Sequence, residues 1–253
     1  NKLWDKLKSN KEIRKHVLPS GDKVKEGGFT HFMIVLNDKS LANIPADLQR
    51  VPIVVNPRDC VPKDYIRGNI KDNMKLIPES KFIQKCKTHN EHGIIISGGP
   101  NIDYDELKDT IKKYPNSLTI CVKHAYPGLI KNGIKPNACI LLDPRSIEGE
   151  STHGIKRKDL LKNPDADTKF LVASMTDPSV TNYLIENKAD IWGWHAFTES
   201  LRDDDDRKHA IKNNQVKIRE DVGLPVGATL ITGGTCAAMR AIGMLHTMGF
   251  RNL

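Results

Sequence analysis

The stretch GIIISGGPNID, residues 93–103, joins a short apolar run to two glycines and then to the start of a helix. The apolar run does not alternate with polar residues, which is typical of a strand buried on both faces. Gly98 and Gly99 lack a Cβ, so the backbone can turn sharply there and a ligand can approach it closely. Asp103 and Glu106 have the spacing of a capping box, which predicts a helix beginning directly after Asp103. The stretch therefore predicts either a phosphate site at a helix N-terminus or a tight turn that binds nothing.

Similar apolar runs and helical segments alternate along the rest of the chain, from about residue 90 onward. Strands are expected at residues 93–97, 118–122, 138–143, 169–174 and 190–194. Helices are expected at residues 104–113, 127–132, 179–187 and 235–247. Buried strands separated by helices are typical of βαβ units, whose strands pair in parallel. We therefore predict an α/β protein with a Rossmann-like, doubly wound and mainly parallel sheet.

The chain is predicted to have two parts, because the regular alternation is missing from its beginning. Residues 1–66 are interpreted as a small N-terminal α/β region, in which residues 31–36 and 53–56 could form strands. Residues 67–253 are predicted to form a Rossmann-type nucleotide-binding domain. Since the sequence stops at GFRNL, where a further strand begins, the C-terminal part of this domain is expected to be missing.

The composition is that of a globular protein and excludes several other classes. Of the 253 residues, 38% are hydrophobic and 28% are charged, which excludes a disordered or collagen-like chain. No run approaches the roughly 18 to 20 apolar residues that cross a bilayer, so no membrane span is expected. The five cysteines form no CxxC pair, which argues against a zinc site and favours a cytoplasmic location. The formal net charge of +8 favours a polyanionic or phosphorylated partner, and charge alone does not distinguish nucleotides, nucleic acid and acidic lipid.

A second glycine junction, LITGGTCAA, occupies residues 230–238. Thr232 and Thr235 place hydroxyls beside a helix N-terminus, and Gly233 and Gly234 permit close approach of a ligand. The small residues of the following helix predict that it packs very closely on the sheet or on the other loop. Ligand binding and close packing alone are both retained as interpretations.

An acidic and a basic residue follow the strand expected at residues 138–143. Asp143 lies at the carboxyl end of a buried strand, where doubly wound sheets bind ligands, and it could hold a ribose hydroxyl or Mg²⁺. Arg145 could reach a phosphate with its planar guanidinium. Capping of a turn by Asp143 is the competing interpretation. No tightly bound cofactor is expected, and Mg²⁺ is expected at Asp143 only if the reaction depends on metal.

Two histidines are candidate catalytic residues. His195 follows the cluster WGW (192–194) at a strand end, and His124 follows the strand expected at residues 118–122. A positioned histidine typically contributes a factor of ~10² to 10⁴ as a general acid or base. Gly193 is expected to let another backbone or a ligand ring come near the tryptophans. A core tryptophan beside a surface histidine is the alternative.

Several familiar signatures are absent from the sequence, namely GxxxxGK[ST], GxGxxG, GxSxG and HExxH. Three longer segments occur instead: GGPNIDYDEL (98–107), HAYPGLIKNGIKPNACILLDPR (124–145) and GGTCAAMRAIGMLHTMGF (233–250). In this order they resemble the MptE-like family over residues 67–253. Asn101 and Asn137 stand where that family usually has Ser and Asp.

The family includes archaeal 6-hydroxymethylpterin diphosphokinases and the central domain of bacterial motility accessory factors, which glycosylate flagellin. The resemblance implies a Rossmann-like domain related to sialyltransferases, with the first glycine loop at the nucleotide. The residue pattern and the resemblance together predict a nucleotide or phosphate site formed by Ser97, Gly98, Gly99, Pro100, Asn101, Asp143, Arg145, Thr232, Gly233, Gly234 and Thr235.

Three functions remain open on this basis. The first is a glycosyltransferase that uses a nucleotide-activated sugar, such as a CMP-linked nonulosonic acid, with His195 or His124 deprotonating the acceptor hydroxyl. The second is a diphosphokinase that uses ATP and Mg²⁺. The third is a binding or surface-assembly protein that keeps the nucleotide pocket without catalysis. The expected partners are a nucleotide donor and an acceptor (a protein hydroxyl, a glycan or a pterin), and no nucleic acid.

Overall fold

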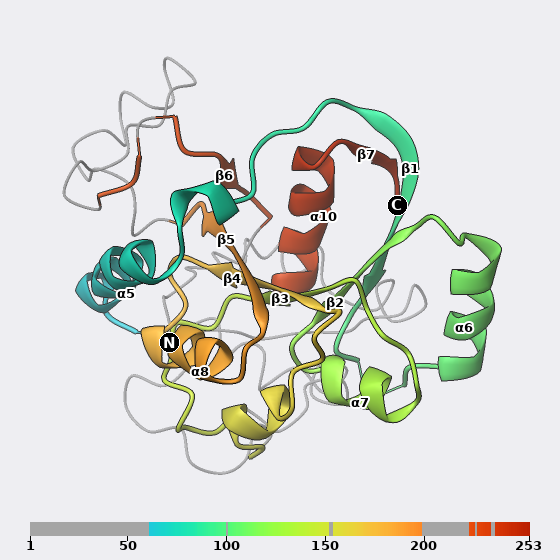
Figure 1. The fold of residues 1–253 in the computed structure, drawn as a ribbon, viewed down its shortest axis with the longest axis horizontal. Coiled ribbons are helices and arrows are strands. Elements are labelled where there is room, and N and C mark those ends of the chain that lie inside the picture. Colours follow the sequence, from blue (N-terminus) through green and yellow to red (C-terminus); the bar gives the residue numbers. More distant parts are fainter. Residues whose placement is uncertain (1–60, 100, 152–153, 199–222, 226, 234–235) are drawn as a thin grey trace, which may run out of the picture. The chain divides into compact units, whose positions relative to one another are not determined.

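The parallel sheet expected from the sequence is present in the computed structural model of the chain (Figure 1). The structure describes residues 61–99, 101–151, 154–198, 223–225, 227–233 and 236–253. Within these residues seven strands form one sheet, and each pairing between neighbouring strands is parallel. The predicted α/β, Rossmann-like fold is confirmed. The strands expected at residues 31–36 and 53–56 lie outside the described residues.

The strand order determines which loops become neighbours. The strands are β1 (His89–Ile96), β2 (Leu118–Val122), β3 (Ala138–Leu141), β4 (Lys169–Ala173), β5 (Asp190–Ala196), β6 (Leu230–Ile231) and β7 (Phe250–Asn252). Their order across the sheet is β6-β5-β4-β3-β2-β1-β7. The chain adds strands in one direction from β1 to β6 and then returns to the other side of β1 as β7. Because all strands run the same way, the loops after them lie at one carboxyl edge, where doubly wound sheets bind ligands.

Helices cover both faces of the sheet (Figure 1). They are α5 (Lys63–Leu76), α6 (Tyr104–Lys113), α7 (Tyr126–Lys131), α8 (Pro178–Glu186) and α10 (Ala237–Thr247), with short 3-10 helices η1 (Glu79–Lys81) and η2 (Arg157–Leu161). α7 and α8 lie on one side of the sheet and α10 lies on the other. Each helix expected from the sequence is present, with its ends within two residues of the predicted positions.

Small side chains allow α10 to lie very close to the strands. A Cβ on Gly243 would be 2.6 Å from the carbonyl oxygen of Thr232, and Ala241 is completely buried. On the strand side, a Cβ on Gly93 would be 2.7 Å from a methyl group of Leu245. The close packing predicted for this helix is therefore confirmed, and missing side chains on both elements make it possible.

The sequence pattern does not predict α5, which begins directly after Pro62. Its buried positions are Ile66, Asn69, Ile70 and Asn73, so half of the buried face consists of amides. Hydrophobic periodicity is the main sequence signal of a helix, and two buried amides weaken it. The buried asparagines also have a consequence for the carboxyl edge, described below.

The core consists of apolar side chains from strands that are buried on both faces, as a parallel sheet requires. The completely buried residues of the central strands are Ile120, Cys121, Cys139, Ile140, Phe170, Val172 and Ala173. In the parts of the chain that the structure describes, no helix combines the length and the apolar character needed to cross a membrane.

Candidate functional site

Three neighbouring strand ends meet at the carboxyl edge of the sheet. Gly98 follows β1, and a Cβ on it would be 3.0 Å from the Cβ of His124, which follows β2. Lys123, the residue before His124, places its Nζ 3.2 Å from Oδ2 of Asp143, which follows β3. The structure thus brings the predicted residues Gly98, His124 and Asp143 to adjoining positions, and Lys123 joins them.

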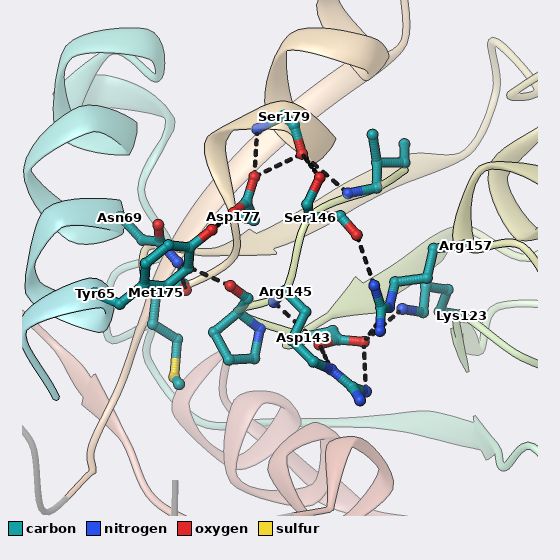
Figure 2. Close-up of polar contacts among 12 residues, drawn as sticks. Tyr65, Asn69, Lys123, Asp143, Arg145, Ser146, Arg157, Met175, Asp177 and Ser179 are labelled. Atoms are coloured by element: carbon teal, nitrogen blue, oxygen red, sulfur yellow. Dashed lines mark hydrogen bonds and ion pairs between the residues drawn. The ribbon is translucent and has the colours of Figure 1, made fainter. Parts of the chain in front are cut away.

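Three cationic side chains surround the carboxylate of Asp143 (Figure 2). Arg145 donates from Nε to Oδ1 at 2.8 Å and from Nη2 to Oδ2 at 3.0 Å, so its guanidinium holds both carboxylate oxygens. Lys123 Nζ and Arg157 Nε each lie 3.2 Å from Oδ2. Arg145 is one of the predicted phosphate ligands, whereas Lys123 and Arg157 are found only in the structure. We call Lys123, Asp143, Arg145 and Arg157 the cation cluster.

Three of the four side chains in the cation cluster are largely shielded from water, whereas that of Arg145 is 35% exposed. The side chains of Lys123, Asp143 and Arg157 are 11%, 16% and 8% exposed. Burial acts to raise the pKa of Asp143, but the hydrogen bond from Arg145 and the charge of Lys123 outweigh it and lower the pKa to about 2. Burial also lowers the pKa of Lys123, and the charge of Asp143 opposes this change. An ionised carboxylate therefore balances part of a dense positive charge.

We expect Asp143→Asn to lower the free energy of unfolding by about 2 kcal/mol at neutral pH, because folding lowers the pKa of this carboxyl from 3.8 to about 2. A carboxyl with a lowered pKa stabilises the fold above its unfolded-state pKa and loses that contribution as the pH falls towards 2. The difference between parent and variant, measured by urea unfolding, should therefore shrink on acidification below about pH 4.

Asp109→Asn is the matched control for this prediction. It removes the same charge from an exposed pair with Lys112 on α6, and such pairs contribute little to stability. A stability difference between parent and Asp143→Asn that does not change with pH would contradict the ion-pair assignment.

α5 fixes the loops of the carboxyl edge with two buried amides, Asn69 and Asn73, of which Figure 2 shows Asn69. Asn69 Nδ2 donates to the carbonyl oxygens of Pro144 and Met175, at 3.0 and 3.1 Å. Asn73 Nδ2 donates to the carbonyl oxygens that flank Met175 in the sequence. Because Pro144 lies between Asp143 and Arg145, the amide of Asn69 restrains the backbone that carries half of the cation cluster.

The first glycine loop leaves space for a ligand at one of its two glycines. A Cβ on Gly99 would meet none of the described residues within 4 Å, and Ser97 and Asn101 are exposed. Pro100 lies outside the described residues. The predicted capping residue, Asp103, accepts from the N–H groups of the second and third residues of α6, at 3.1 and 3.0 Å. The side chain of Asp103 thus accepts hydrogen bonds from two of the free N–H groups at the start of α6, which are then not available to a phosphate.

The described start of the second glycine junction, Thr232 and Gly233, lies elsewhere along the edge. It follows β6, and four strands separate β6 from β1 in the sheet order, so Thr232 and Gly233 are not placed beside Gly98. Gly233 has a φ of +135°, and a Cβ on it would be 2.5 Å from the carbonyl oxygen of Met239. Close packing of this loop against α10 therefore explains why residue 233 is a glycine. Thr232 is exposed, and Gly234 and Thr235 lie outside the described residues.

The two candidate histidines have different surroundings. His195 is 4% exposed, its ring stacks on Phe82 with centroids 4.5 Å apart, and its Nδ1 lies 3.1 Å from the hydroxyl of Ser174. Burial lowers the pKa of His195 to about 4, whereas the sequence alone suggests an ordinary value. The expected approach of another backbone to Gly193 is confirmed, because Phe82 forms a β-bridge with Gly193 and a Cβ on Gly193 would be 2.6 Å from the Phe82 ring. His124 is exposed at the carboxyl edge. The catalytic assignment of both histidines stays a prediction.

The protein is an α/β protein with a Rossmann-like parallel sheet. Its cation cluster and its first glycine loop lie at the carboxyl edge of that sheet, where such proteins bind their ligands. The model of the family described as 6-hydroxymethylpterin diphosphokinase MptE-like matches residues 66–253, so the chain belongs to the MptE-like family. No curated protein sequence matches the chain.

A solved structure with the same fold is that of a MAf glycosyltransferase from Magnetospirillum magneticum AMB-1. The two share 16% sequence identity with a TM-score of 0.53, over 86% of this chain and 30% of the glycosyltransferase chain. The present sequence therefore corresponds to less than a third of that protein, and the likeness shows a shared fold.

Proposed function

We propose that this protein is a nucleotide-dependent transferase, and specifically a glycosyltransferase that uses a nucleotide-activated sugar of the CMP-nonulosonic acid type. The observation that carries the proposal is the cation cluster beside the glycine loop at the carboxyl edge. Membership of the MptE-like family and the fold of a MAf glycosyltransferase support a transferase activity. Figure 2 shows the charged groups to which the proposal assigns the phosphate.

The chemistry of sugar transfer suits these residues. When the bond between the sugar and the phosphate breaks, the nucleotide leaves with additional negative charge on its phosphate. Lys123, Arg145 and Arg157 would stabilise that charge in a site with little water, where fixed charges act strongly. His124 would take the proton of the acceptor hydroxyl, because it is exposed beside Gly98, whereas His195 is buried. The acceptor could be a protein hydroxyl, a glycan or a pterin.

The diphosphokinase is the second candidate, because the description of the family names that activity. Such a reaction uses ATP with Mg²⁺, and Asp143 is the carboxylate that would hold the ion. Both oxygens of Asp143 already face cationic side chains, so its surroundings do not fit a divalent cation. Among the described residues, no group of three or more histidine, cysteine or acidic side chains could hold a metal ion. We therefore rank sugar transfer above diphosphate transfer.

A binding screen tests the proposal and its rivals. CMP, CDP, UDP, ADP and ATP would be titrated calorimetrically into the protein, each with and without Mg²⁺. Preferential binding of CMP without metal is the result expected for sugar transfer. Preferential binding of ATP with Mg²⁺ would favour the diphosphokinase. Nucleotide binding without turnover of any donor would favour the third function, a non-catalytic binding protein.

A further inference from the structure

A short hairpin in the segment between β3 and β4 delivers Arg157 to the cation cluster. An antiparallel bridge closes this hairpin, and the N–H of Arg157 donates to the carbonyl oxygen of Gly149 at 2.9 Å. Arg157 Nη1 donates to the carbonyl oxygen of Ser146 at 2.7 Å. A Cβ on Gly149 would overlap Nη1, so the guanidinium occupies the space that this glycine leaves. The fold thus sets the position of Arg157 through several independent contacts.

The start of α8 anchors the segment that leads into this hairpin (Figure 2). The hydroxyl of Ser179 accepts from the N–H of Ile147 at 3.0 Å and donates to Asp177 at 2.6 Å. Asp177 in turn accepts from the N–H of Ser179 and from the hydroxyl of Tyr65 on α5. Two helices therefore hold the segment that carries Arg157, so its position does not depend on Asp143 alone.

One member of the cation cluster, Arg157, has a buried hydrogen-bond donor that finds no acceptor among the described residues. Three positive side chains face one carboxylate, which leaves an excess of two positive charges within the cluster. Arg157 Nε is buried, and although it lies 3.2 Å from Asp143, its N–H makes no hydrogen bond within the described structure. A buried donor without an acceptor is unfavourable, and an anionic ligand would supply the acceptor.

We infer that Lys123, Arg145 and Arg157 form a subsite for a dianionic phosphoryl group, in which Asp143 positions the three cations. The inference rests on the proposed function and deepens it, because the nucleoside monophosphate that sugar transfer releases carries a phosphate dianion. The charge excess of the cluster equals the charge of a phosphate dianion. Guanidinium groups also match the geometry of phosphate oxygens with paired N–H donors. Asp143 acts here as a positioning residue and not as a ligand for ribose or metal.

Inorganic pyrophosphate is the probe that tests the subsite without a nucleoside. It would be titrated calorimetrically into the parent protein, Arg157→Gln and Lys158→Gln. The two variants lose the same charge at adjacent positions, but Lys158 is half exposed and lies near Glu148. We expect Arg157→Gln to weaken pyrophosphate binding by about tenfold or more, and Lys158→Gln by less than about twofold. Equal affinities of the parent and Arg157→Gln would overturn the inference.

Gly149→Ala keeps every charge but displaces the guanidinium of Arg157, so it serves as a second test if Arg157→Gln does not fold. Its pyrophosphate affinity should fall in the same direction. If folded Gly149→Ala binds pyrophosphate like the parent protein, the assignment of Arg157 to the subsite is wrong.

A CMP titration separates this inference from the proposed function. If pyrophosphate binding depends on Arg157 but no nucleotide binds, the subsite stands and the proposed function fails. If CMP binds the parent and Arg157→Gln equally and pyrophosphate binds neither, the function stands and the subsite fails. If pyrophosphate binding depends on Arg157 and CMP competes with it, the subsite is supported and the donor nucleotide is the source of the phosphoryl group. Simultaneous binding of the two also supports the subsite and assigns it to the second substrate.

Discussion

Replacing Gly99 by valine is expected to weaken nucleotide binding by more than about a hundredfold while the protein remains folded. A Cβ at Gly99 meets none of the described residues within 4 Å, so a larger side chain is expected to leave the fold intact. The valine side chain would project into the space that a phosphate needs if it approaches the backbone of this loop. The expected loss thus arises from the ligand and not from the fold.

Gly98→Val is the informative partner of this variant. A Cβ on Gly98 would be 3.0 Å from the Cβ of His124 and 3.2 Å from a methyl of Val122, so valine should displace the end of β2 and lower the melting temperature. Gly99→Val should keep the melting temperature of the parent, measured by circular dichroism, and lose CMP binding in calorimetry. CMP affinity of Gly99→Val within about threefold of the parent would remove this loop from the site.

The sequence predicts the fold well because parallel strands carry a strong and local signal. The runs that become β2, β3 and β4 are apolar on both faces, and the pattern marks them almost to the residue. The N-cap residue Asp103 fixes the beginning of α6 in the same local way. α5 has no such signal, because Asn69 and Asn73 are buried for their hydrogen bonds to distant carbonyl groups.

The cation cluster could be predicted only in part. Asp143 and Arg145 are two residues apart after a recognisable strand, so the sequence predicts that they lie together at the end of that strand. Lys123 also directly follows a predicted strand, and this position is the signal that could have identified it. Arg157 has no comparable signal, because its place depends on a hairpin and on the missing side chain of Gly149. Contacts that depend on tertiary structure in this way are not encoded in local spacing.

The two histidines are expected to differ when each is replaced. His124→Ala should reduce turnover by about a hundredfold or more and leave stability nearly unchanged, because a general base contributes a factor of this size and His124 is exposed. His195→Ala should lower the free energy of unfolding by about 2 to 4 kcal/mol, because it leaves a cavity beside Phe82 and removes the partner of Ser174.

His195→Phe separates packing from catalysis at this position. Phenylalanine preserves an aromatic ring against Phe82 but cannot accept a proton, so a packing role predicts a folded variant with most of its turnover. A catalytic role predicts a folded variant whose turnover falls by about a hundredfold with CMP affinity unchanged. Because burial lowers the pKa of His195 to about 4, its imidazole is a weaker base than an exposed histidine. We therefore expect His195→Phe to retain turnover and His124→Ala to lose it, and the opposite pair of results would move the general base to His195.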